Sequence, residues 1–288
     1  MRIITPPVME YIDVINACMT SIDSHDLKSR VDEIVSILLR VGVEYYDKAE
    51  SSLLNELPIF HGKDSDIVIS RVTKKELKGL YTDYMVPSNK PARMYYDKIK
   101  LSASLGICPF CGFGHVNTLD HYLPKSKFPL ISILPINLVP CCADCNKGKT
   151  SRVAVEPSEL SLHPYFNDQR FISQQWLFAT VKHTNPVVID YYVNAPFEWG
   201  VVLSERAKNH FQDFRLKTRY AVQAGNELAS LVHELNIDYE ISGSEGVRRS
   251  LEKKALASLM QERNSWRTAM YQALSEDEWF YSEGFMIR

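Results

Sequence analysis

The chain has 288 residues, of which 45% are hydrophobic and 24% are charged, and its formal net charge is −2. This composition is ordinary for a globular protein and excludes collagen-like and highly charged disordered chains. There is no apolar run of about 18 residues, the length that a membrane-spanning helix needs. The N-terminal segment Met1–Pro7 lacks the apolar stretch of a secretion signal, so we expect a cytoplasmic protein.

Positive charge is concentrated in one part of the chain. From Lys90 to Arg152 there are nine Lys or Arg residues and three Asp or Glu residues, a balance of +6, whereas the remainder carries −8. A local positive surface is what a polyanion such as nucleic acid needs in order to dock. Short windows also vary in charge by chance, so this excess alone does not establish a nucleic-acid-binding protein.

Residues 1–105 are predicted to form a helical region. Apolar residues recur at helical spacing between positions 6 and 50, and this pattern makes Cys18 a core thiol of the first helix. Thr73 and Glu76 have the spacing of a capping box at the start of a later helix. The helix that ends near Gly106 is expected to bury the apolar residues Met94, Ile99, Leu101 and Leu105.

Five of the six cysteines lie within 38 residues and include two C-x-x-C pairs, Cys108 with Cys111 and Cys142 with Cys145. In a reducing compartment such pairs indicate metal ligands rather than disulfides. Four thiolates satisfy the tetrahedral preference of Zn²⁺ and predict a closed, structural site. Unligated core cysteines are the alternative. Cys141 is a second candidate ligand beside Cys142, although the two-residue spacing favours Cys142.

Asp120 and His121 lie in the 30-residue spacer between the two cysteine pairs. An isolated Asp-His pair is usually a surface or capping pair, so the prediction depends on this placement. On a short strand the two side chains point to opposite faces, which suits His121 as a general base and Asp120 as a metal ligand. Asn146 falls in the first turn of the helix after the second pair. Asp120 and Asn146 therefore offer oxygen ligands for Mg²⁺ or Mn²⁺.

With Asn137 on the expected second strand, this segment resembles the HNH endonuclease motif. The resemblance implies a zinc-framed ββα-metal module over residues 106–170. It implies that His121 activates water and that Asp120 and Asn146 hold a single catalytic metal ion. It also implies that Asn137 braces the loop that orients His121. The helix residue is Asn rather than His, a variant seen in the family that favours Mg²⁺ over softer metals.

Sequence outside the motif is similar to HNH proteins of bacterial anti-phage systems, especially the PtuB nucleases of Septu and the related retron-associated nucleases. The segments that carry this similarity are Leu80-Tyr81, Ala92–Asp97, His163–Phe166, Asn264–Arg267 and Tyr271–Leu274. The resemblance implies an ABC/SMC-like ATPase partner similar to PtuA. Because the chain has no G-x-x-x-x-G-K-[ST] motif, any ATP dependence would come from that partner.

Several basic residues are candidates for binding the nucleic-acid backbone. Solvated surface lysines are the alternative for each lysine. His163 is either an additional ligand or phosphate contact, or a packed histidine, and Arg93 either reaches the site or pairs with Asp97. The candidate substrate contacts are Lys125, Lys127, Lys147, Lys149, His163 and Arg93.

Residues 171–288 are predicted to form a β-hairpin followed by helices. The strands are expected near 175–183 and 187–193, and the helices near 203–214, 216–236, 246–260 and 263–274. The predicted fold class is therefore α+β: a mostly helical chain with a zinc-framed ββα-metal module and a short β-hairpin.

The predicted function is hydrolysis of nucleic-acid phosphodiesters by an HNH endonuclease, acting as the effector of an anti-phage defence system. The alternative is a catalytically inactive, zinc-built module that binds nucleic acid or serves as a structural subunit of an ATPase complex. The sequence does not distinguish DNA from RNA as the substrate.

Overall fold

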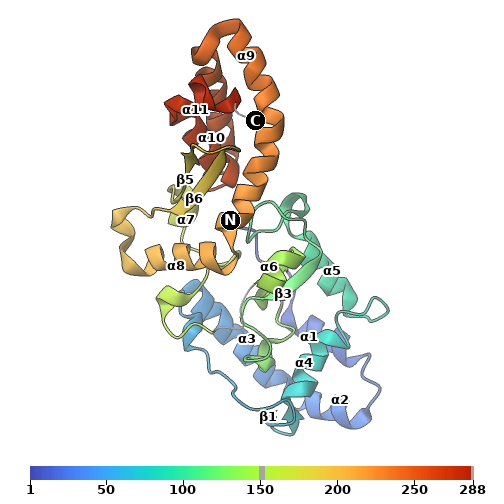
Figure 1. Cartoon of the computed structure of the whole chain (residues 1–288). Helices are drawn as coiled ribbons and strands as arrows, with labels where there is room; N and C mark the ends of the chain where they lie inside the picture. Colours follow the sequence, from blue (N-terminus) through green and yellow to red (C-terminus); the bar gives the residue numbers. More distant parts are fainter. Residues whose placement is uncertain (149–152, 287–288) are drawn as a thin grey trace. The chain divides into compact units, whose positions relative to one another are not determined.

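Figure 1 shows the computed structural model of the chain, which describes residues 1–148 and 153–286. The chain divides into two compact units: Arg2–Asn167, and Asp168–Arg288 together with Met1. Helices combined with small antiparallel strand pairs confirm the predicted α+β class. Within the described ranges, no helix has the length and apolar character needed to cross a lipid bilayer.

The N-terminal unit consists of helices and two pairs of short strands. Its helices are α1 (Tyr11–Met19), α2 (His25–Asp32), α3 (Val35–Glu50), α4 (Lys74–Thr82), α5 (Arg93–Leu101) and α6 (Ala143–Gly148). Its strands are β1 (Ile67–Ile69), β2 (Val72–Thr73), β3 (Thr118–His121) and β4 (Leu138–Cys141). Single 3-10 turns are η1 (Leu54–Glu56), η2 (Ser104–Gly106), η3 (Pro129–Ile131), η4 (Pro135–Asn137) and η5 (Pro157–Glu159).

One hydrophobic core joins the N-terminal helices to the β3–β4 pair. Its buried members include Val14, Leu38, Leu77, Ile99, Leu119 and Leu138. A two-stranded sheet buries too little apolar surface to be stable alone, so β3 and β4 depend on the surrounding helices. The predicted regions 1–105 and 106–170 therefore form one unit. The boundary to the C-terminal region lies at residue 168 rather than at 171.

Helix α4 begins with the predicted capping box. The Thr73 hydroxyl accepts a hydrogen bond from the Glu76 backbone N–H, and the Glu76 carboxylate accepts one from the Thr73 backbone N–H. These bonds satisfy backbone donors that have no partner within the helix. The helix ends at Thr82, slightly before the predicted end near Met85.

For helix α5, the prediction of which side chains are buried is wrong. The buried side chains are Ala92, Tyr96 and Ile99, which recur at helical spacing and point to the core. Three of the four residues expected to be buried are instead exposed: Met94 (51%), Leu101 (78%) and Leu105 (84%). Met94 and Leu101 lie on another side of α5, and Leu105 lies beyond its end in η2. Periodicity alone does not say which side of a helix meets the core.

The C-terminal unit packs helices against one β-hairpin. Its elements are α7 (Arg170–Ser173), β5 (Leu177–Lys182), β6 (Val188–Val193), η6 (Phe197–Trp199), α8 (Gly200–Asp213), α9 (Leu216–Gln261), α10 (Trp266–Glu276), α11 (Glu278–Ser282) and η7 (Gly284–Met286). Strands β5 and β6 pair antiparallel with Leu177 opposite Val193, which confirms the predicted hairpin. Helices α9 and α10 pack against this hairpin.

Helix α9 covers the residues of two predicted helices, 216–236 and 246–260. Gly243 interrupts it with a φ of 61° and a ψ of −159°, a backbone conformation that suits glycine. The two arms on either side of this residue run antiparallel (Figure 1), and Lys254 pairs with Glu234 at 2.7 Å across them. The interruption is therefore a single tight turn rather than the longer connection expected between residues 236 and 246.

Candidate functional site

The four cysteines of the two C-x-x-C pairs converge in the N-terminal unit. All are buried, and their sulfur atoms lie within 4.8 Å of one another. The Cys111 and Cys142 sulfurs are 3.9 Å apart. A tetrahedral zinc site with bonds of about 2.3 Å requires sulfur–sulfur separations of roughly 3.8 Å. The sulfurs are therefore close enough together to hold a metal ion such as zinc.

The backbone around the first cysteine pair is shaped to approach the sulfurs closely. The Gly114 N–H donates to the Cys111 sulfur at 3.3 Å, and the Cys108 N–H donates to the Gly114 carbonyl at 2.7 Å. A Cβ atom at Gly114 would lie 2.8 Å from the Cys142 sulfur, which is closer than real Cβ contacts. Gly112 has a φ of +75°. The chain thus requires glycine at both positions of this turn.

Hydrogen bonds among the four thiols shift their pKa values in opposite directions. Hydrogen bonding to Cys108 lowers the pKa of Cys111 to about 6. The same kind of bond lowers the pKa of Cys142, which also accepts a hydrogen bond from the Cys145 N–H at 3.5 Å. The pKa values of Cys108 and Cys145 are raised because their protons are shared with neighbouring sulfurs. Metal ligation requires all four as thiolates.

Cys142, and not Cys141, belongs to the sulfur cluster, as the spacing predicted. Cys141 is the last residue of β4, where it pairs with Thr118 of β3 and is fully buried. Cys18 is likewise a buried core thiol, as predicted, and its sulfur donates to the Leu80 carbonyl.

Strands β3 and β4 pair antiparallel. Helix α6 begins at Ala143, directly after Cys142. Asp120 lies opposite Val139, and His121 lies opposite Leu138. The alternation along β3 is clear from burial, because Asp120 is half-buried and His121 is buried. The Asn146 side-chain amide on α6 donates to the Thr118 hydroxyl at 3.4 Å. Since Thr118 and Asp120 share one face of β3, Asp120 and Asn146 lie on the same side of the strand.

The His121 ring has a defined tautomer. Its Nε2 lies 2.7 Å from the Ser132 carbonyl oxygen, and only 8% of the residue is exposed. A carbonyl oxygen can only accept a hydrogen bond, so Nε2 carries the proton. In the neutral ring Nδ1 is then the basic nitrogen. Ser132 is itself fixed, because its hydroxyl donates to the Leu77 carbonyl at 2.5 Å.

Asn137 ties the two ends of the β3–β4 loop together. Its Oδ1 accepts a hydrogen bond from the Leu123 N–H at 2.8 Å. Its Nδ2 donates to the carbonyls of Leu123 at 3.1 Å and Ile131 at 3.3 Å. Asn137 is fully buried and lies in η4, just before β4. The loop it closes contains Ser132, whose carbonyl receives the His121 hydrogen bond.

Lys125 and His121 share a contact with one aromatic ring, that of Tyr81. The Lys125 ammonium lies over the Tyr81 ring, 4.4 Å from the centroid, and that ring also packs against His121. Burial lowers the pKa of Lys125, and the nearby positive charge of Lys78 lowers it further. Asp120 acts in the opposite direction, so its carboxylate lies within electrostatic range of the ammonium.

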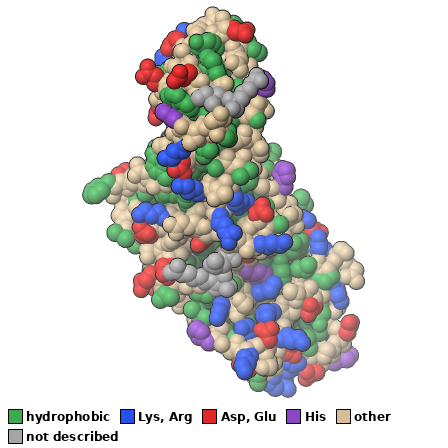
Figure 2. Space-filling view, viewed as in Figure 1, with side chains coloured by type: hydrophobic (Ala, Val, Ile, Leu, Met, Phe, Trp, Pro, Cys, Tyr) green, Lys and Arg blue, Asp and Glu red, His purple; other side chains and the backbone are tan. Residues whose placement is uncertain are grey.

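The other candidate lysines are placed differently. Lys127 is half-buried in the β3–β4 loop, where its carbonyl accepts a hydrogen bond from the Phe60 N–H at 2.9 Å. Lys147 is exposed on α6. Lys149 lies outside the described residues. On the face of the molecule drawn in Figure 2, Lys and Arg side chains are numerous and are mixed with Asp and Glu.

Arg93 forms the intrahelical pair that was one of its two alternatives. Its Nε donates to the Asp97 carboxylate at 3.0 Å, and its guanidinium lies 4.5 Å from the centroid of the Tyr96 ring. It also donates to the Val86 carbonyl. These contacts hold Arg93 on α5. Burial raises the pKa of Tyr81, and the charge of Arg93 opposes this shift only in part.

His163 adopts the packed alternative. It is 1% exposed, and its ring stacks on Tyr122 with 4.0 Å between the centroids. Its Nδ1 accepts a hydrogen bond from the Tyr165 N–H, and its Nε2 lies 3.1 Å from the Tyr45 hydroxyl. Both ring nitrogens are therefore used inside the protein, which does not suit a role in phosphate binding.

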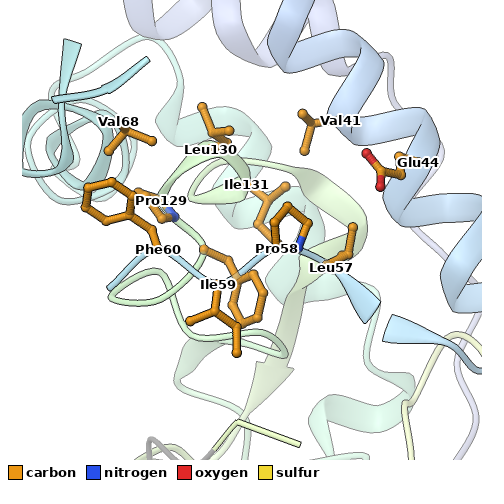
Figure 3. A pocket seen from close by; sticks show the side chains of 11 residues that line it. Val41, Glu44, Leu57, Pro58, Ile59, Phe60, Val68, Pro129, Leu130 and Ile131 are labelled. Carbon is orange, nitrogen blue, oxygen red and sulfur yellow. The ribbon is translucent and has the colours of Figure 1, made fainter. Parts of the chain in front are cut away.

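A pocket of about 240 Å³ lies elsewhere in the same unit (Figure 3). Segment Leu57–Phe60 lines one part of it and Phe128–Ile131 another, and the side chains are apolar except for Glu44. Neither His121 nor Asp120 is among its lining residues. The pocket has no group of side chains suited to acid–base chemistry or metal binding, so we do not place the candidate active site there.

The chain is similar to protein ea31 of Escherichia phage lambda. The two are 29% identical over 290 residues, which cover 96% of this chain and 97% of the phage protein. The similarity therefore extends over both compact units. No model of a known protein family and no solved structure matches the chain.

The sequence interpretation gave two residues of the site no contact with His121. Tyr81 belongs to a segment that carried the resemblance to anti-phage nucleases, but its contacts with His121 and Lys125 join residues 40 or more positions apart. Ser132 acts through its backbone carbonyl, which carries no signal in a sequence. Packing alone brings these groups to the histidine.

Proposed function

We propose that this protein is a metal-dependent nuclease of the HNH type that hydrolyses phosphodiester bonds in nucleic acid. The arrangement of β3, β4 and α6 carries the proposal. This arrangement puts Asp120 and Asn146 on one side of β3 and fixes the neighbouring His121 through the Ser132 carbonyl. A general base beside two oxygen ligands is the minimum that metal-assisted hydrolysis requires.

The two proposed metal sites have different chemistry. Four cysteines close the first site completely, so a zinc ion there has no open position for water and serves as a structural frame. The second site offers oxygen atoms. Because the Asn146 amide nitrogen is engaged by Thr118, its carbonyl oxygen is the group that remains for a cation beside the Asp120 carboxylate. Oxygen donors fit Mg²⁺ or Mn²⁺.

In the proposed reaction, His121 accepts a proton from water at Nδ1 while the water oxygen attacks phosphorus in line. The bond from phosphorus to the 3′ oxygen breaks as the new one forms, and the leaving oxygen takes a proton from solvent. A bound Mg²⁺ or Mn²⁺ would stabilise the charge that develops on the phosphate and on the leaving oxygen. Lys125 binds a non-bridging phosphate oxygen.

The decisive experiment compares the wild-type protein with His121→Ala on plasmid DNA and on total RNA, each with Mg²⁺ or Mn²⁺. Loss of the base should slow cleavage by at least about 100-fold. The matched control is His115→Ala, because His115 is an exposed histidine in the first cysteine turn. Equal cleavage by wild type and His121→Ala would remove the proposed role of His121.

The resemblance to anti-phage nucleases supports a further part of the proposal, namely an ABC/SMC-like ATPase as partner and a role in defence. The cleavage assay is therefore repeated with that ATPase subunit and ATP. Nucleic-acid binding without cleavage under both conditions would favour the alternative, a zinc-built binding or structural subunit.

A further inference from the structure

Tyr81, near the end of α4, contacts both the candidate base and the candidate phosphate-binding lysine. Its ring and the His121 ring are T-shaped, with centroids 4.4 Å apart and an interplanar angle of 73°. The Lys125 ammonium lies 4.4 Å from the centroid of the same tyrosine ring. The proposed reaction assigns no role to this tyrosine.

The contact with Tyr81 fixes the orientation of the His121 ring, which the hydrogen bond to Ser132 alone does not fix. The bond from Nε2 to the Ser132 carbonyl fixes one point of the imidazole but permits rotation about the bond. An aromatic ring packed at 73° against the imidazole restricts that rotation. The direction in which Nδ1 presents its lone pair therefore depends on Tyr81.

The contact with Lys125 holds a cation without neutralising it. A cation over an aromatic face is attracted by the ring, yet it keeps its full charge. Within the described part of the chain, no carboxylate forms an ion pair with Lys125. Its ammonium thus remains able to bind an anion, while the ring restricts where the long side chain lies.

Tyr81 is rigid enough to serve as a reference for both groups. It is 6% exposed, and its hydroxyl donates to the Leu119 carbonyl on β3 at 3.5 Å. Its ring also packs against Tyr96 of α5, with centroids 6.3 Å apart. The capping box at Thr73 and Glu76 fixes the start of the helix that carries it.

We propose that Tyr81 is a positioning residue that sets His121 and a backbone phosphate bound by Lys125 at the separation that in-line attack requires. The inference rests on the proposed nuclease function and adds a specific phosphate subsite to it. Displacement of a reacting group by about 1 Å can lower the rate on the order of 100-fold. Substitution of a positioning residue should therefore lower kcat by more than its effect on folding stability accounts for.

The test uses four variants of the full chain: Tyr81→Phe, Tyr81→Leu, Tyr271→Leu and Lys125→Gln. Tyr81→Phe keeps the ring and should cleave within about threefold of wild type. Tyr81→Leu should lower kcat by about 10- to 100-fold and shift the ¹⁵N resonances of the His121 imidazole. Tyr271→Leu is the matched control, because Tyr271 is similarly buried (5%), also has a lysine ammonium over its ring, and belongs to the C-terminal unit.

Lys125→Gln should raise KM. The slope of log binding constant against log salt concentration should fall by the amount that corresponds to about one phosphate contact. The double variant Tyr81→Leu/Lys125→Gln should weaken binding by less than the product of the two single effects, because both disrupt one subsite. Unchanged His121 resonances in Tyr81→Leu, or losses equal to those of Tyr271→Leu, would overturn the inference.

The inference can fail separately from the nuclease proposal. If wild type cleaves nothing, the His121 resonances and the binding cycle between Tyr81 and Lys125, measured with a non-cleaved oligonucleotide, still test the positioning role. If wild type cleaves and Tyr81→Leu cleaves equally well, the nuclease proposal stands and the positioning role is rejected.

Discussion

Asn137 contributes to the site through the backbone rather than through contact with a substrate. It is fully buried and forms three hydrogen bonds with the backbone of the β3–β4 loop. The same loop presents the Ser132 carbonyl to His121. Asn137 is thus linked to the candidate base His121 only through the backbone of this loop.

We expect Asn137→Ala to destabilise the protein by about 2–4 kcal/mol, because it leaves the N–H and the carbonyl of Leu123 buried without their partner, whereas the Ile131 carbonyl keeps the Leu134 N–H. Asn137→Asp keeps the acceptor for Leu123 but turns a carboxylate oxygen towards the Leu123 and Ile131 carbonyls, so it should not recover the lost stability at pH 7. Urea denaturation measures both. Asn236→Ala is the control, since that amide bonds only to the preceding helical turn and should change stability by less than about 0.5 kcal/mol. A loss of the same size in the control would contradict the prediction.

At the scale of one element, helix α4 is anchored by a charged network at its first turn. The Glu76 carboxylate accepts hydrogen bonds from the Thr73 N–H and hydroxyl, both at 2.8 Å, and from two Arg30 nitrogens at 2.7 and 3.0 Å. The Arg30 hydrogen bonds lower the pKa of Glu76 to about 2. This helix carries Tyr81, so its cap is linked to the candidate site.

Because the folded-state pKa of Glu76 lies below the ordinary value of 4.5, its carboxylate contributes stability above pH 4.5 and loses it as the pH falls towards 2. Glu76→Gln should therefore reduce the free energy of unfolding by about 1–2 kcal/mol at pH 7. The difference in the free energy of unfolding between wild type and Glu76→Gln should narrow as the pH falls from 4.5 towards 2.

Urea denaturation at several pH values checks this prediction. The control is Glu33→Gln, since the Glu33–Arg71 pair is exposed and should contribute about 0–1 kcal/mol. A Glu76→Gln difference that stays constant with pH would show that the carboxylate charge is not its cause.

For the whole molecule, the division into two units has a spectroscopic consequence. All four tryptophans, Trp176, Trp199, Trp266 and Trp279, belong to the C-terminal unit, whereas the cysteine cluster belongs to the N-terminal unit. Tryptophan fluorescence therefore reports unfolding of one unit, and metal content reports on the other.

Purified protein should contain about one zinc ion per chain, and removing it with a chelator should lower the melting temperature of the N-terminal unit, followed by circular dichroism. The fluorescence transition of the tryptophans should stay in place. Restoring zinc, but not Mg²⁺, should reverse the change. Equal shifts of both signals would show that the units unfold together, and a folded, zinc-free protein would contradict the structural frame.

The sequence by itself determined the features that depend on short-range spacing. The two C-x-x-C pairs, the adjacency of Asp120 and His121 on a strand, the capping box and the β5–β6 hairpin are all set by residues a few positions apart. Local stereochemistry decides such features, because a strand alternates and a helix repeats whatever surrounds it.

Only the tertiary structure decided which faces these elements bury and which distant groups meet. It exposed Leu101 and Leu105, enclosed His163 among aromatic rings, and brought Tyr81 and the Ser132 carbonyl to His121. These outcomes follow from close packing of one core across long sequence separations, which periodicity does not encode.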